Sequence, residues 1–322
     1  MAAQRSVEPD AGAGAPDIRG NTPALEAVLA EGEGSRVDAV VVTGDVLTGP
    51  DPRGTLDLLL ALPYPVHFIR GNADQEVVDA VDGRYPATGD HDWDALTLWT
   101  APHMARTTRD LIAGWPTKAT LPIDGIGDVL FVHATPRSLM DIVLVDTPMA
   151  GWDAVLAGTD AAAIVLGHTH MPFYRRVDRC LVANAGSVGM PYGHDGASSL
   201  VLGPTVVFRQ TVYDVEAASR RILAVGCSGA SEFVRDYVQS HPSDREALTA
   251  FRATWGGVEG ARIRCGICVR DSAPRSKRSL LPRLFIGGRS DKHMTQGEAI
   301  VAGADDVTLA SKTYPSKNRS AG

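Results

Sequence analysis

The chain has 322 residues and a formal net charge of −7, and 44% of its residues are hydrophobic and 21% charged. At about 100–200 residues per domain, this length can bury one large core or two modest ones, and 33 Gly and 20 Pro without a repeat exclude collagen-like and wholly disordered chains. The sequence has no run of about 18 apolar residues and no apolar stretch near its start, and its four cysteines are irregularly spaced. These features predict a cytoplasmic protein with no membrane partner.

Charge is divided unevenly along the chain. Residues 256–322 hold 12 Lys and Arg against 6 Asp and Glu, so residues 1–255 hold 19 against 32. An acidic body argues against a stable nucleic-acid partner, because nucleic-acid phosphates attract basic surfaces. We therefore expect one domain over residues 17–255, between a disordered Ala/Gly/Pro-rich segment at 1–16 and a basic, largely disordered tail at 256–322.

Short β-branched runs alternate with helical patterns over residues 37–212, which is typical of an α/β fold. In chain order, the patterns predict strands at 37–42, 65–69, 129–132, 162–166, 181–183, 199–202 and 206–210. Helical spacing predicts helices at 22–31, 54–62, 75–81, 93–111 and 215–224. The strand runs are continuously apolar, which favours strands covered on both faces.

Polar side chains follow five of these predicted strands. They are Asp45, then Asn72 with Asp74, then His133, then His168 with His170, and last Asn184. Ligands of α/β sheets bind beyond the carboxyl ends of the strands, so we expect these side chains at one rim. Glycines before several of them fit tight bends that bring the backbone close to an ion.

Imidazoles, carboxylates and an amide oxygen together suit Mn²⁺, Fe²⁺, Zn²⁺ or Co²⁺ better than Ca²⁺. Asp17, before the first helix, adds a further carboxylate, and about six ligands are too many for one tetrahedral site. The set therefore predicts a dinuclear centre bridged by Asp45. Each residue also has a structural interpretation: His133 as a core histidine, the two histidines of 168–170 on opposite faces, and Asp45 as a helix cap.

Taken in order, Asp17-Ile-Arg19-Gly-Asn21, Gly44-Asp45, Gly71-Asn72-Ala-Asp74, His133 and Gly167-His168-Thr-His170 resemble the motif series of the calcineurin-like metallophosphoesterases. The likeness covers residues 17–255 and is greatest to the small bacterial phosphodiesterase branch. It implies an α/β four-layer α/β/β/α sandwich with two divalent metal ions, Mn²⁺ foremost and Fe²⁺, Zn²⁺, Co²⁺ or Ni²⁺ as alternatives. Asp17, Asp45 and His170 would hold one ion, and Asp45, Asn72, His133 and His168 the other.

The resemblance further implies hydrolysis of phosphodiester or nucleotide phosphate bonds in a small phosphorylated substrate. A metal-bridging hydroxide would attack phosphorus, Asn72 would also orient the phosphate, and Asp74 would steady the turn. Ala73 stands where many relatives have a His that assists the leaving group. Without a general acid, which contributes about 10²–10⁴-fold, substrates with good leaving groups should be favoured.

Two departures from the family pattern bear on activity. Arg19 replaces a His ligand, and because a guanidinium does not ligate metals, one ion should bind weakly. Arg19 would then act as a phosphate clamp or swing into solvent. The apolar run expected before Asp17 is also absent, so the first strand is predicted to be missing or displaced. The alternative function is therefore a degraded relative that binds one metal and phosphate or a nucleotide without turnover.

The remaining signals predict no function. Cys265 and Cys268 are half of a zinc ribbon without a second pair, and the basic run at 275–283 is typical of a solvated tail. The aromatic and acidic stretch at 91–99 indicates the start of a helix rather than a substrate cap.

Overall fold

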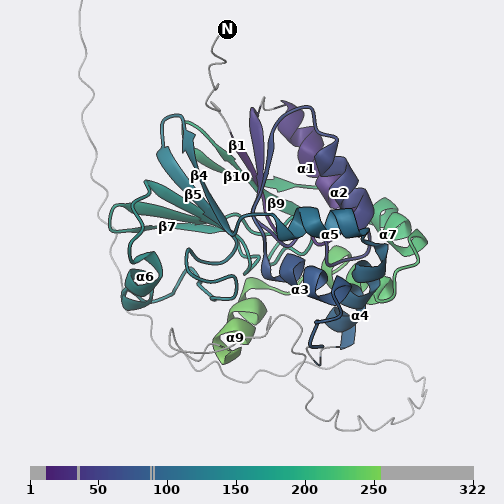
Figure 1. Cartoon of the computed structure of the whole chain (residues 1–322). Coiled ribbons are helices and arrows are strands. Elements are labelled where there is room, and N and C mark those ends of the chain that lie inside the picture. Colours follow the sequence, from purple (N-terminus) through teal and green to yellow (C-terminus); the bar gives the residue numbers. More distant parts are fainter. Residues whose placement is uncertain (1–11, 35–36, 88, 90, 255–322) are drawn as a thin grey trace, which may run out of the picture. The chain divides into compact units, whose positions relative to one another are not determined.

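The computed structural model describes residues 12–34, 37–87, 89 and 91–254, and its strands form two five-stranded sheets (Figure 1). Residues 1–11 and the predicted tail, with Cys265, Cys268 and the basic run, lie outside the described residues. The first sheet has the order β10-β9-β1-β2-β3, and the second has the order β4-β5-β6-β8-β7.

Each sheet has three adjacent parallel strands. In the first these are β1 (Gly12–Ala15), β2 (Ala39–Val42) and β3 (Val66–Phe68); β9 (Ala197–Leu202) runs antiparallel to β1, and β10 (Val206–Thr211) runs antiparallel to β9. In the second they are β5 (Gly127–Val132), β6 (Ala163–Leu166) and β8 (Cys180–Asn184), edged by the antiparallel β4 (Lys118–Ile123) and β7 (Phe173–Val177). The parallel strands of a sheet therefore end at the same edge, where residues 17, 45, 72, 133 and 168 follow them.

Side-chain alternation along the strands builds the layers. Val41 packs between the sheets with Phe131 and Val165, whereas Val40 and Val42 face the opposite way, toward the helices. On the second sheet, Leu130 and Ile164 similarly point outward, against the helix that carries Trp152. Because residues on a strand point alternately to the two faces, continuously apolar runs fill the core between the sheets and the two outer cores. The predicted α/β/β/α sandwich is confirmed.

The helices are distributed over these outer faces and the ends of the sheets (Figure 1). Those that pack on the first sheet are α1 (Thr22–Gly34), α2 (Pro52–Leu60), α3 (Asn72–Val81) and α5 (Arg106–Ala113). The second sheet is covered by α6 (Met149–Leu156). The others are α4 (His91–Thr100), the 3₁₀ turn η1 (Ala101–His103), α7 (Val215–Ala224), α8 (Ala230–Phe233), the π turn η2 (Val234–Val238) and α9 (Asp244–Thr254).

The expectation that the first strand is missing or displaced is wrong, as is the expectation of disorder for residues 12–15. The sequence Gly-Ala-Gly-Ala forms β1 in the middle of the first sheet, between β2 and β9. A Cβ added at Gly14 would stand 3.6 Å from the Leu200 Cβ of β9, an ordinary van der Waals contact. Main-chain pairing on both sides holds this strand, and its side chains add only the small alanines Ala13 and Ala15 to the core, so hydrophobic patterning does not detect it.

Other differences are local. The single helix predicted at 93–111 is divided into α4, η1 and α5, because Pro102 lacks the N–H that a continuous helix requires. Helix α4 confirms a helix start in the stretch at 91–99. The strands β4 and β7 and the helices α6, α8 and α9 were not predicted. Among the described residues, no helix is long and apolar enough to cross a bilayer.

Candidate metal centre

The loops after the parallel strands of both sheets meet at one edge. The Asp17 N–H donates to the carbonyl of Gly44 at 3.2 Å, and the Gly167 N–H donates to that of His133 at 2.9 Å. The turns are tight: Gly71 approaches Asp45 so closely that a Cβ there would stand 2.0 Å from its Oδ1. The chain thus brings together all eight predicted site residues, which are Asp17, Arg19, Asp45, Asn72, Asp74, His133, His168 and His170, and each is buried.

One group of ligand atoms surrounds His133 Nε2. Asn72 Oδ1 lies 2.9 Å away, His168 Nδ1 3.2 Å and Asp45 Oδ2 3.3 Å. His133 Nδ1 lies 2.8 Å from the carbonyl of Thr43, so in the neutral ring the proton is on Nδ1 and Nε2 is the acceptor. With His133 in this neutral form, lone pairs of Asp45, Asn72, His133 and His168 can converge on one point, which is the arrangement of a cation site.

A second group includes the other predicted ligands. His170 Nε2 lies 3.1 Å from Asp17 Oδ1, and its Nδ1 is held by the carbonyl of Met190 at 3.0 Å. Within this group lies the guanidinium of Arg19, which makes an ion pair with Asp45 Oδ2. Arg19 is fully buried, so the expectation that it swings into solvent is wrong.

Comparison with known families shows which family the chain belongs to. Residues 16–205 match the model of the calcineurin-like phosphoesterase superfamily domain. The chain belongs to the calcineurin-like phosphoesterase superfamily. No curated protein sequence matches this chain significantly.

Solved structures show the same fold. A hypothetical protein from Pyrococcus horikoshii is 20% identical with a TM-score of 0.61, covering 72% of this chain and 99% of its own. A metallophosphoesterase from Sphaerobacter thermophilus is 23% identical with a TM-score of 0.56, covering 70% and 96%. The likeness extends to almost the full length of both structures, so the chain shares their fold.

The group around His133 fits a divalent ion. Atoms of Asp45, His133 and His168 lie within 4.8 Å of one another, and all three residues are buried. Two imidazoles, a carboxylate and the adjacent amide oxygen of Asn72 form a mixed N/O set that suits intermediate divalent ions. The superfamily is metal-dependent, and these residues of the chain could hold an ion.

When no ion is bound, the close packing of these groups changes the pKa values of His133 and His168. Burial disfavours an imidazolium at His133, yet the nearby Asp45 carboxylate raises the pKa of His133 to about 9. Burial and repulsion from His133 lower the pKa of His168 to about 3. A metal ion in this group would therefore displace a proton from His133.

Two further polar residues hold the loops of the candidate metal centre in place. Asp74 accepts hydrogen bonds from the N–H groups of Asp45, Val46 and Gly71 at 2.8–2.9 Å, which ties the turn after β3 to the turn after β2. Asn184 donates to the carbonyl of Gly167 at 2.7 Å and so braces the turn that carries both histidines. Asn184, at the end of β8, is thus placed to position His168 and His170, which follow β6.

Sequence reasoning missed Glu76 and Trp93. Glu76 accepts a hydrogen bond from Trp93 Nε1 at 2.8 Å and one from Asn72 Nδ2 at 3.5 Å, which leaves Asn72 Oδ1 turned toward His133. Trp93 also lies over the Arg19 guanidinium, 4.7 Å from its carbon to the ring centre. Glu76 follows Asn72 by four residues on α3, and this helical spacing was the signal available in the sequence.

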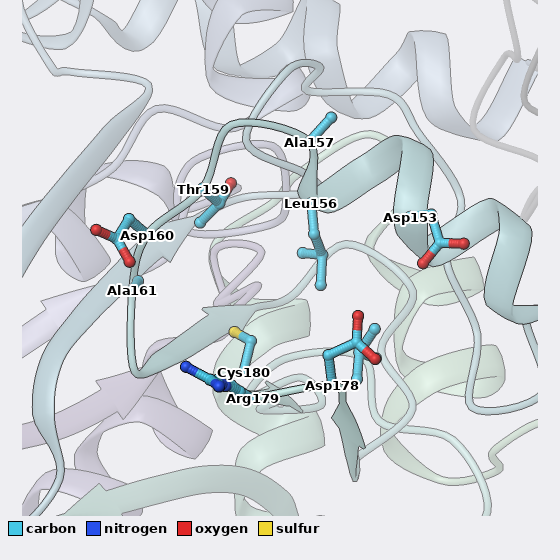
Figure 2. Close-up of a pocket in the computed structure, with 10 residues that line it drawn as sticks. Asp153, Leu156, Ala157, Thr159, Asp160, Ala161, Asp178, Arg179 and Cys180 are labelled. Atoms are coloured by element: carbon cyan, nitrogen blue, oxygen red, sulfur yellow. The ribbon is translucent and has the colours of Figure 1, made fainter.

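A separate pocket of about 760 Å³ lies on the second sheet, lined by residues of α6, its following loop and the β7–β8 turn (Figure 2). Of the residues that line it, Ala161 lies two residues before β6 and Cys180 begins β8, whereas His168 follows the end of β6. The pocket is therefore at the opposite end of the strands from the candidate metal centre.

Proposed function

We propose that the chain is a divalent-metal-dependent phosphoesterase that hydrolyses phosphodiester or nucleotide phosphate bonds of a small substrate in the cytoplasm, with Mn²⁺ as the preferred ion. The single observation that carries this proposal is the convergence of Asp45, Asn72, His133 and His168 at one buried point. Family membership supports the chemistry, because the matched family consists of phosphoesterases.

When bound, the ion would lower the pKa of a water molecule and neutralise phosphoryl oxygens, each effect supplying several kcal/mol. The residues of this chain would hold and orient the reactants. Asp45 is shared between the two groups of ligand atoms, and Asn72, 4% exposed, would bind both the ion and a phosphate oxygen. Asp74 acts through Asp45 as a positioning residue.

The substrate class follows from the residue next to Asn72. Ala73 offers no proton for a leaving group, so substrates whose leaving groups depart as stable anions are favoured. Aryl phosphodiesters and nucleotides therefore fit the proposal better than alkyl phosphomonoesters.

The test is hydrolysis of bis-p-nitrophenyl phosphate by the purified full chain with Mn²⁺. We expect turnover that EDTA abolishes and that His168→Ala lowers by on the order of 10²-fold or more, because the variant loses a metal ligand. His103→Ala, an exposed histidine on η1, is the matched control and should retain the activity. Equal rates for the wild type and His168→Ala would contradict the proposal.

A second candidate function is supported by Arg19. A guanidinium that lies among the ligands of one ion favours a protein that binds one metal and a phosphate or nucleotide without turnover. Binding of a nucleotide to the Mn²⁺-loaded chain, measured by calorimetry, together with no release of p-nitrophenol would favour this alternative.

A further inference from the structure

Arg19 is among the largest fully buried side chains of the described residues, and its charge lies inside the candidate metal centre. Burying a cation is costly unless anions and hydrogen-bond acceptors surround it. The contacts of Arg19 therefore show which groups balance its positive charge.

The guanidinium contacts one atom of each residue that the family resemblance assigns to one ion. Arg19 Nη2 is 3.5 Å from Asp17 Oδ1 and 3.3 Å from His170 Nε2, and it forms an ion pair with Asp45 Oδ2. With its proton on Nδ1, facing Met190, His170 presents an acceptor to the guanidinium. Three acceptor atoms thus converge on one nitrogen as they would on a metal ion.

The position of the guanidinium is fixed on its other side. Trp93 covers its face at 4.7 Å, and Glu76 holds the Trp93 indole by a hydrogen bond of 2.8 Å. The backbone N–H of Arg19 donates to the Asp45 carbonyl at 3.0 Å, and the Arg19 backbone is in the left-handed conformation with φ 56°. The side chain is therefore built into the centre and is not a surface residue that folds over it.

We propose that the Arg19 guanidinium permanently takes the place of one of the two metal ions, so that this chain binds a single divalent ion, through Asp45, Asn72, His133 and His168. A second ion among Asp17, Asp45 and His170 would stand against a fixed positive charge that already occupies their acceptor atoms. Asp45, which contacts both the guanidinium and His133, would then be a ligand of the one ion while still pairing with Arg19. This inference rests on the proposed metal site but not on hydrolysis.

Metal stoichiometry tests the proposal directly. The full chain is stripped with EDTA, saturated with Mn²⁺, desalted and analysed for bound manganese, and its electron paramagnetic resonance spectrum is recorded. We expect one Mn²⁺ per chain with the spectrum of an isolated ion. Arg19→His, which exchanges the guanidinium for a ligand, should bind two and show the exchange coupling of a dinuclear centre.

Arg53→His is the matched control, because it places the same new imidazole on an exposed position of α2. It should bind one ion, as the wild type does. Two ions per wild-type chain would overturn the proposal, and so would a folded Arg19→His variant that still binds one.

A second variant keeps the proposal testable if Arg19→His folds poorly. Arg19→Met retains the stem of the side chain but leaves Asp17 and Asp45 without the guanidinium, so the melting temperature in EDTA should fall by about 10 °C. Added Mn²⁺ should raise the melting temperature of Arg19→Met more than that of the wild type, because an ion can now enter the group of Asp17 and His170. Equal increases in the two proteins would contradict the proposal.

The two proposals fail in different ways. One ion per chain without turnover of bis-p-nitrophenyl phosphate would retain the role of Arg19 and reject hydrolysis. Turnover by a chain that holds two ions would retain hydrolysis and reject the role of Arg19.

Discussion

At the scale of single residues, the candidate centre concentrates unusual backbone conformations. Of the six described non-glycine residues with positive φ, five belong to the site: Asp17, Arg19, Asp45, His168 and His170. Such conformations cost on the order of 1–3 kcal/mol each and persist where the surrounding structure enforces them. Here hydrogen bonds between neighbouring loops enforce them, as between the Asp45 N–H and Asp74.

The close approach of Gly71 to Asp45 gives a prediction at this scale. Gly71→Ala should weaken Mn²⁺ binding by at least tenfold and lower the melting temperature, because the new Cβ would stand 2.0 Å from Asp45 Oδ1 and 2.5 Å from its backbone nitrogen. Calorimetric titration with Mn²⁺ and thermal unfolding provide the measurements.

Gly32→Ala is the control for Gly71→Ala. Gly32 lies within α1 with nothing inside 4 Å of an added Cβ, so alanine there should leave binding unchanged and stabilise the fold by up to about 1 kcal/mol. Unchanged Mn²⁺ affinity in Gly71→Ala would show that the turn after β3 does not set the position of Asp45.

At the scale of elements, α3 carries Asn72 at its first residue and is fastened to α5 at its other end. Asp82, which follows α3, makes ion pairs with Arg84, Arg106 and Arg109, and the last two belong to α5. The hydrogen bond from Arg109, supported by Arg84, lowers the pKa of Asp82 to about 2, from an ordinary value of 3.8.

Because the folded state lowers this pKa, the Asp82 carboxylate stabilises the fold above about pH 4. That contribution is lost as the pH falls from about 4 toward 2. Asp82→Asn should therefore have a lower melting temperature than the wild type at pH 7, and the difference should shrink as the pH approaches 3. Asp57→Asn, on an exposed position of α2, should match the wild type throughout. A difference for Asp82→Asn that does not change with pH would contradict this assignment.

At the scale of the whole molecule, the candidate ion site joins the two sheets. Asp45 and Asn72 follow strands of the first sheet, whereas His133 and His168 follow strands of the second. An ion bound by all four would therefore oppose separation of the sheets. Ligand binding to the folded state alone stabilises it by about 2.7 kcal/mol at a hundredfold excess over the dissociation constant.

We accordingly expect Mn²⁺ at this excess to raise the melting temperature by about 5–10 °C. Hydrogen exchange should slow in the loops after both β2 and β6. His133→Ala should lose both effects, and His103→Ala should keep them. Slower exchange in one loop alone would show that the ion does not bridge the sheets.

The sequence by itself determined the parts of this protein that depend on local pattern. Continuously apolar strands such as those ending before Asp45 and His168 must be covered on both faces, which indicates the layered α/β fold. The polar residue after each strand marks the edge where a ligand binds, because parallel strands end together. The order of these motifs was sufficient to suggest the family.

Only the tertiary structure decided what depends on neighbours far apart in the chain. Strand β1 is formed by main-chain pairing with β2 and β9, and Gly-Ala-Gly-Ala carries no signal of it. The position of Arg19 required Asp45, His170 and Trp93 to be brought together from three other segments. Such contacts offset the desolvation cost of burying the charge. Their geometry is set by packing and not by spacing along the sequence.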